Sequence, residues 1–172
     1  MKTTKCLNEW NAIIEALGNG KQTVLIRKYG TSLKGFLLYP TVSYAKKDDV
    51  LDCFQEEYKS FANENLLPKS EDKKFEVKYY AQVEKIIEKS SNRIGSFNKY
   101  HIWTKGHVKS YLGHKTAEVW LLRVYKLKES KILSRTRGML YANVSDEVSL
   151  DGMTPVISDK DFEDLKSEIL KL

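Results

Sequence analysis

Apolar side chains recur with helical spacing in three stretches of the chain, which predicts helices over residues 9–17, 48–63 and 158–171. The first follows Asn8, a residue type that often caps a helix, and it ends at a Gly-Asn-Gly sequence. The second begins at a pair of aspartates, whose charge favours the positive end of the helix dipole. The third begins at Ser158, which is again a capping residue type. Shorter helices are expected in the segments between the later strands.

Alternation of apolar and polar residues predicts strands over 22–29, 35–39, 75–87 and 117–127. The third is the clearest, because five alternate positions are apolar: Phe75, Val77, Tyr79, Ala81 and Val83. It is longer than the usual ~5–6 residues, so we expect it to bend or to carry a bulge. Residues 130–150 look irregular, which leaves room for a short strand over 139–144.

Strands dispersed among helices predict the α+β fold class, with a curved mixed sheet and flanking helices. A length of 172 residues is typical of one domain that can bury a core, so residues 1–172 are expected to form a single domain.

Charge is distributed unevenly along this chain, whose formal net charge is +6. Residues 73–140 hold 16 Lys and Arg against 5 Asp and Glu, a local charge of +11, whereas residues 141–172 carry −5. The basic region also holds seven flat polar aromatic residues: Tyr79, Tyr80, Tyr100, Trp103, Tyr111, Trp120 and Tyr125. Cations interleaved with flat rings suit a phosphate backbone with stackable bases.

The leading hypothesis is therefore a non-catalytic module that binds RNA or DNA. Arginine binds phosphate through two parallel hydrogen bonds, and lysine binds it as a point charge. The expected phosphate ligands are Arg27, Lys28, Lys78, Arg123, Arg135 and Arg137. A base would stack on Tyr80 or Trp103.

An enzyme is the first alternative. The Glu76-Val77-Lys78 triplet fits the E-x-K half of a PD-(D/E)XK nuclease site, in which carboxylates hold Mg²⁺ and the lysine stabilises developing charge. The upstream aspartates available to complete it are Asp48, Asp49 and Asp52, which helix capping also explains.

A protein-interaction module is the second alternative. Carboxylates of the acidic tail could pair with the basic region, either within one chain or between two chains. Exposed ion pairs contribute only ~0–1 kcal/mol each, so we expect a monomer or a weak homodimer.

Other chemistries find little support in the sequence. His101, His107 and His114 lack the spacing of a zinc site, and no glycine-rich phosphate loop follows a strand, so we expect no metal, cofactor or catalytic residue. Two cysteines without framework spacing indicate reduced thiols in a cytoplasmic protein. We expect neither a signal peptide nor a membrane span, because no long apolar run is present.

Several short motifs together resemble the prokaryotic domain-of-unknown-function family 1802. They run from Gly20-x-Gln22-Thr-Val-Leu-Ile-Arg-Lys-x-Gly30 through Phe36-Leu-Leu-Tyr-Pro-Thr41 and His101-Ile-Trp-Thr104 to Leu122-Arg-Val-Tyr-Lys-Leu127 and Pro155-Val-Ile-Ser-Asp159. That family supplies no functional residue. A looser resemblance links the chain to PUA-like barrels of the ASCH type, which implies a small barrel that contacts RNA or nucleotides. Gly20 and Arg27 match the ASCH pattern, but Gln22 and Leu25 replace its lysine and glutamate.

Overall fold

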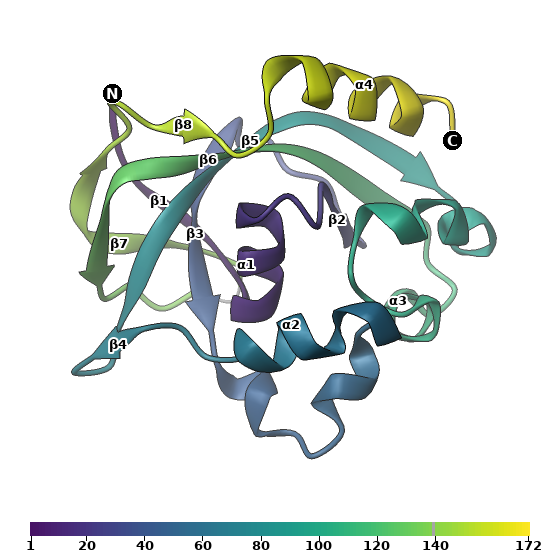
Figure 1. Ribbon diagram of the computed structural model, residues 1–172, viewed down its shortest axis with the longest axis horizontal. Helices are drawn as coiled ribbons and strands as arrows, with labels where there is room; N and C mark the ends of the chain where they lie inside the picture. Colours follow the sequence, from purple (N-terminus) through teal and green to yellow (C-terminus); the bar gives the residue numbers. More distant parts are fainter. Residues whose placement is uncertain (139) are drawn as a thin grey trace.

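The strands of the protein form one mixed sheet, described here from a computed structural model for residues 1–138 and 140–172 (Figure 1). The strands are β1 (Lys2–Trp10), β2 (Val24–Arg27), β3 (Gly35–Thr41), β4 (Ser70–Glu71), β5 (Lys74–Lys89), β6 (Ala117–Leu133), β7 (Tyr141–Ser149) and β8 (Thr154–Pro155). Their order is β2-β6-β5-β3-β1-β7, with the short β4 and β8 pairing with β5 and β6. β1 and β3 run parallel and the other pairs of described strands run antiparallel, so the predicted α+β class with a mixed sheet is confirmed.

The far end of β6 curls back to meet β7. Arg135 forms an isolated antiparallel bridge with Val144, and the Ser145 amide donates to the Ser134 carbonyl at 2.9 Å. β6, β5, β3, β1 and β7 therefore surround a small interior. The strong curvature of this part of the sheet is visible in Figure 1.

Buried apolar residues form two clusters on opposite faces of this sheet. Consecutive residues of a strand alternate between them: Cys6 and Leu37 belong to the smaller cluster, while Leu7 and Leu38 belong to the larger one. The smaller cluster fills the curled end of the sheet. The larger cluster holds the contacts with the helices.

The β5–β6 ribbon is the longest element pair, with strands of 16 and 17 residues. Its pairing register shifts between Val77 and Tyr79 and again between Val83 and Lys85. The expected irregularity in the long strand is thus confirmed, because an extra residue on one strand lets the ribbon bend around the core.

Helices cover the larger apolar cluster. They are α1 (Asn11–Gly18), α2 (Lys59–Glu64), α3 (Lys105–Leu112) and α4 (Asp159–Leu170), with 3₁₀ turns at Ser43–Lys46, Val50–Cys53, Glu56–Tyr58 and Ser91–Tyr100. Seven of the eight residues of α1 are buried, and Figure 1 shows this helix enclosed near the centre of the molecule. α4 starts at the predicted cap, where the Ser158 hydroxyl accepts from the Asp161 amide.

Three sequence expectations need correction. The predicted helix over 48–63 is two 3₁₀ turns followed by the short α2. Its apolar residues still pack on the larger cluster, but from an irregular segment instead of one face of a helix. Asn8 is no helix cap, because it lies inside β1 and its side chain donates to the Gly138 carbonyl. Residues 130–150 are mostly extended, in β6 and β7; Met139, where a strand was expected to begin, lies outside the described residues.

β1 was not predicted, yet it lies in the sheet between β3 and β7. Its first half is polar, with the sequence Lys-Thr-Thr-Lys, and lacks clear alternation. Hydrogen bonds to the neighbouring strands on both edges stabilise β1 as a strand, although its own sequence gives no clear sign of strand structure.

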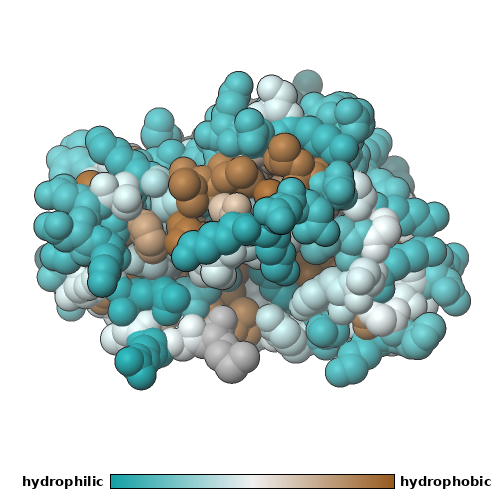
Figure 2. Space-filling model, turned by 90° about the horizontal axis from the view of Figure 1, so that it is seen from below, coloured by the Kyte–Doolittle hydropathy of each residue, from teal (hydrophilic) through white to brown (hydrophobic). Residues whose placement is uncertain are grey.

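Two surface properties complete the description. Figure 2 shows apolar side chains gathered near the middle of the face seen from below, with hydrophilic residues around them. In the described part of the chain, no helix is both long enough and apolar enough to cross a membrane.

Candidate functional site

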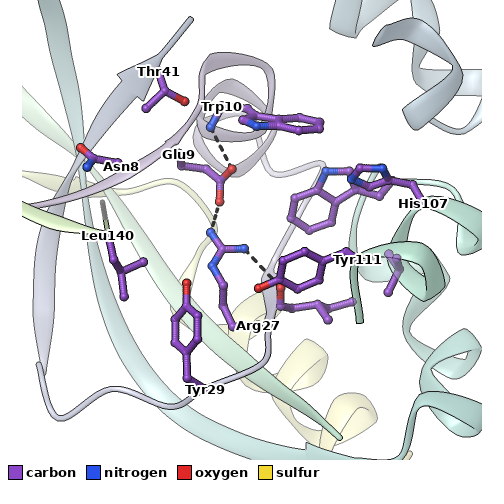
Figure 3. A pocket seen from close by; sticks show the side chains of 12 residues that line it. Asn8, Glu9, Trp10, Arg27, Tyr29, Thr41, His107, Tyr111 and Leu140 are labelled. Carbon is purple, nitrogen blue, oxygen red and sulfur yellow. Dashed lines mark hydrogen bonds and ion pairs between the residues drawn. The ribbon is translucent and has the colours of Figure 1, made fainter. Parts of the chain in front are cut away.

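A pocket of about 330 Å³ opens where β1, β2 and β3 end beside α3 (Figure 3). Three segments that are distant in sequence contribute to its wall, together with single residues from two others. The lining residues are Asn8, Glu9, Trp10, Ile26, Arg27, Tyr29, Thr41, Trp103, His107, Val108, Tyr111 and Leu140. This mixture of aromatic rings and a few polar groups is typical of ligand sites.

The parallel pairing of β1 with β3 brings the strand ends together. Trp10 lies opposite Thr41 in the register, and the Asn8 amide nitrogen donates to the Leu140 carbonyl at 2.9 Å. α3 begins at Thr104, whose hydroxyl accepts from the His107 amide at 3.0 Å. His107 and Tyr111 lie one turn apart on the same face of α3, so both rings reach the pocket.

A buried ion pair forms the polar floor of the pocket. The Arg27 guanidinium donates through Nη2 to Glu9 Oε2 and through Nη1 to the Ile26 carbonyl. Glu9 Oε1 accepts from the Trp10 amide at 2.8 Å. Burial opposes the charge of Arg27, but the adjacent Glu9 carboxylate outweighs this effect and raises the arginine pKa. Arg27 therefore stays charged inside the protein.

Aromatic rings form the walls. Trp10 stacks on Tyr44 with ring centroids 4.6 Å apart and planes 3° from parallel, which holds the indole rigidly. His107 lies between two indoles, 5.3 Å from Trp10 and 6.4 Å from Trp103. Burial and the nearby Lys47 lower the pKa of His107, so the imidazole is neutral at pH 7.

Two tyrosines and a lysine surround the mouth. Figure 3 shows the hydroxyls of Tyr29 and Tyr111 on either side of the Arg27 side chain. Partial burial raises the pKa of Tyr29, although the charge of Arg27 partly offsets it. The Lys28 ammonium lies 4.6 Å from the centroid of the Tyr111 ring, so an exposed cation is held at the edge of the pocket.

Three of the residues predicted from the sequence belong to this site. Arg27 and Trp103 line the pocket, and Lys28 lies at its edge. Arg27 is paired with a carboxylate, however, so it is not an open phosphate ligand. Trp103 is only 6% exposed, and it forms part of the wall instead of presenting a free face to solvent.

Two other predicted phosphate ligands are engaged in the fold. Arg123 is buried between the rings of Tyr125 and Phe162, and it donates to Asp159 at 2.7 Å and to the Ile157 carbonyl. Lys78 pairs with Glu15 at 2.5 Å beside a second, polar cavity of about 170 Å³. Neither residue lines the aromatic pocket.

Tyr80, the other predicted stacking residue, is half-buried on β5 away from the pocket. Its hydroxyl occupies the space where a side chain at residue 35 would begin, so any residue larger than glycine at position 35 would require the Tyr80 ring to move.

Arg135 and Arg137 remain exposed in the segment between β6 and β7. Arg135 lies 5.5 Å from the centroid of the Tyr39 ring and donates to the Thr136 carbonyl. Arg137 precedes Gly138, whose carbonyl accepts from the side chain of the pocket residue Asn8. This arginine segment therefore passes close to one side of the pocket.

The nuclease alternative gains no metal site from the structure. Glu76 accepts from Ser130, and Asp52 pairs with Lys59 in the 3₁₀ region. Within residues 1–138 and 140–172, no group of three or more His, Cys, Asp or Glu side chains is arranged to hold a metal ion.

Cys6 and Cys53 are free thiols, and burial raises the pKa of Cys6 to about 11.

Sequence reasoning missed most of the pocket. Asn8, Glu9 and Trp10 were assigned to a helix start, and Tyr29, Thr41 and His107 were given no role in a site. One signal was available in the sequence. Glu9 lies beside Trp10, and Arg27 ends an apolar strand, so both charges are close to buried residues. Because a buried charge is costly without a partner, the two could have been expected to pair. Their pairing depends on the β1 and β2 ends meeting in space.

Solved structures with a similar fold include ASCH from Zymomonas mobilis. It is 13% identical, with a TM-score of 0.46, over 95% of this chain and 93% of that one. Two single-substitution mutants of that protein match with TM-scores of 0.46 and 0.45, each at 13% identity, over 95% of this chain and 94% and 96% of theirs. No residue role follows from these similarities. None of the curated proteins matches this chain.

Residues 6–168 match the family described as "Domain of unknown function (DUF1802)". The match runs from β1 to the last turns of α4, and it includes all the residues that line the pocket. The chain therefore belongs to the DUF1802 family.

Proposed function

We propose that this protein is a non-catalytic module that binds single-stranded RNA or DNA, with the aromatic pocket at the centre of the binding face. The observation that carries the proposal is the pocket of stacked rings with an exposed cation, Lys28, held against one of them. Aromatic platforms beside positive charge are the usual means of binding single strands without strong sequence preference.

The surroundings of the pocket support an anionic ligand. Residues 99–116, which include α3, contain four lysines and no Asp or Glu. Lys105, Lys109 and Lys115 of this segment are exposed. A region with one sign of charge raises the local concentration of an oppositely charged strand and speeds its association.

The expected phosphate ligands are accordingly Lys28, Arg135 and Arg137, which are exposed cations: Lys28 lies at the mouth of the pocket, and the two arginines lie in the segment that follows β6. Lys78 and Arg123 hold the fold together through Glu15 and Asp159, and we do not assign them to the nucleic acid. Three carboxylates of the acidic tail pair within their own chain: Asp159 with Arg123, Glu168 with Lys99, and Asp151 with the N-terminal ammonium.

Fluorescence anisotropy with short labelled single strands tests the proposal. RNA and DNA oligonucleotides should bind at low salt, and the logarithm of the affinity should fall with the logarithm of salt concentration with a slope near −0.7 per neutralised phosphate. Lys28→Ala should reduce that slope by about 0.7. Lys131→Ala is the matched control, because Lys131 is an exposed lysine at the other end of the β5–β6 ribbon. Absence of binding to both nucleic acids at low salt would refute the proposal.

A further inference from the structure

We infer that the pocket receives one unpaired base of the bound strand, while the phosphates stay outside at its edge. This inference rests on the proposed function, and it goes further by assigning a ligand group to the Glu9–Arg27 floor. Three features of the pocket lead to it: its size, its walls and the charge of its floor.

The size suits a single ring system. A volume of about 330 Å³ corresponds to roughly eleven waters at ~30 Å³ each. That is enough for a purine or a pyrimidine and too little for two stacked nucleotides. A ligand of this size would fill the space between Trp10, Tyr111 and Leu140.

The walls suit a flat and uncharged group. Trp10 is held by stacking on Tyr44, so its position needs no ordering when a ligand enters. The neutral His107 adds a further aromatic surface between the two indoles without adding charge. Stacking a base on aromatic side chains contributes ~1–3 kcal/mol per base.

The floor favours a base over a phosphate. Glu9 and Arg27 cancel in charge, so the floor lacks the net positive charge that attracts an anion, and a phosphate there would approach the Glu9 carboxylate. The pair still has hydrogen-bonding capacity: a carboxylate offers about four lone-pair sites and a guanidinium about five N–H donors. The observed bonds engage Glu9 with Arg27 and the Trp10 amide, and Arg27 with the Ile26 carbonyl. A donor beside an acceptor, as on the edge of a nucleobase, matches the capacity that remains.

The exposed cation is placed to complement this arrangement. Lys28 follows the floor residue Arg27 directly in the chain, and its ammonium lies over Tyr111 at the mouth. A base on the floor side of Tyr111 would leave its sugar and phosphate near this lysine.

Abasic oligonucleotides separate the base from the backbone. We would compare three DNA strands of equal length: all thymine, fully abasic with tetrahydrofuran sugars, and abasic with a single 2-aminopurine. The fully abasic strand should bind roughly 5- to 150-fold more weakly than the all-thymine strand, the equivalent of one stacked base. One 2-aminopurine should restore most of that loss, and its emission should change on binding because the base becomes stacked.

Matched aromatic variants locate the effect. Tyr111→Ala should weaken the one-base strand by a larger factor than the fully abasic strand, which is affected only through release of Lys28 from the Tyr111 ring. Tyr80→Ala should affect neither, because Tyr80 is half-buried on β5 outside the pocket. Tyr29→Ala provides a second pocket variant if Tyr111→Ala does not fold, since Tyr29 is 40% exposed and its loss leaves the core intact.

The outcomes distinguish the inference from the proposal beneath it. Equal affinity of the fully abasic and all-thymine strands would overturn the base pocket while leaving a backbone-binding module. A loss of one-base binding in Tyr80→Ala but not in Tyr111→Ala would also overturn it. Failure of all three strands and of RNA to bind at low salt would instead refute the proposed function.

Discussion

Glu9 and Arg27 show how a side chain at one position depends on a partner far away in the sequence. Glu9 is 6% exposed and Arg27 is 9% exposed, and each would carry an uncompensated charge without the other. His101 is also buried, but none of the carboxylates that the structure describes pairs with it. Burial lowers the pKa of this imidazole to about 4, although the neighbouring Trp103 backbone partly opposes the shift.

Breaking the buried pair should cost much more than breaking an exposed pair. Glu9→Gln leaves the Arg27 charge buried and unpaired, so we expect a loss of about 3–5 kcal/mol in the free energy of unfolding. Asp52→Asn, which removes an exposed partner of Lys59, should cost about 0–1 kcal/mol. Urea denaturation measures both, and similar losses in the two variants would contradict the assignment of a buried pair.

Stability should decline as the pH falls from 6.5 towards 4. His101 binds a proton with a pKa of about 4 when folded and 6.5 as the ordinary value, so the unfolded chain takes up more protons in this interval. Its contribution is therefore fully present above pH 6.5 and amounts to at most roughly 3 kcal/mol. His101→Gln should flatten the curve of unfolding free energy against pH, leaving the smaller contribution of His107, which has the same sign.

The wild-type protein, measured across the same pH interval, is the reference for this experiment. If the unfolding free energy of His101→Gln instead had the same pH dependence as that of the wild type between pH 4 and pH 6.5, the lowered pKa of His101 would be contradicted.

At the scale of elements, α4 is attached by both apolar packing and ion pairs. Phe162 and Ile169 are each 1% exposed, and Arg123 lies with its guanidinium 4.7 Å from the centroid of the Phe162 ring. The ion pair Lys99–Glu168 is largely exposed to solvent. Packing should therefore dominate the attachment of the helix.

Substitutions on the two sides of this interface test whether apolar packing contributes more than the ion pair to the attachment of α4. Phe162→Ala should lower the free energy of unfolding by about 3–5 kcal/mol, because it leaves a cavity beneath the helix. Lys99→Ala should lower it far less, because its ion pair with Glu168 is exposed to solvent. Chemical denaturation followed by circular dichroism compares the two variants, and a larger effect for Lys99→Ala would mean that charge holds the tail.

At the scale of the whole molecule, strands of the single sheet contribute residues to both apolar clusters. Leu25 on β2 lies in the larger cluster and Leu133 at the end of β6 in the smaller one. Because β6 runs through both, loss of either cluster should disrupt the strand pairing of the other. We therefore propose that residues 1–172 unfold as a single domain.

Cooperative unfolding checks this proposal. Leu25→Ala and Leu133→Ala should each cost about 2–5 kcal/mol and should shift one common transition. Trp120, Trp103 and Trp10 belong to or pack against the larger cluster, so tryptophan fluorescence reports on that face, while far-ultraviolet circular dichroism reports on the whole sheet. Midpoints that separate between these two probes in Leu133→Ala would indicate two cooperative units.

The sequence by itself determined the elements whose pattern is local. The amphipathic spacing and Ser158 cap define α4, and the alternation around Val77 and Tyr79 defines β5, including its irregular register. The α+β class follows from such elements, because their order along the chain already mixes helices and strands. The family resemblance also came from short motifs in the sequence.

Only the tertiary structure decided the pocket and the state of its charges. β1 is a strand because β3 and β7 pair with it on both edges, and a polar sequence such as Lys-Thr-Thr-Lys carries no local sign of that pairing. Arg27 and Arg123 look alike in sequence, but one meets Glu9 in a pocket and the other meets Asp159 beneath a helix. The sequence supplies the cations, and long-range packing selects which of them pair internally and which face solvent, because desolvation and partner distance depend on residues far apart in the chain.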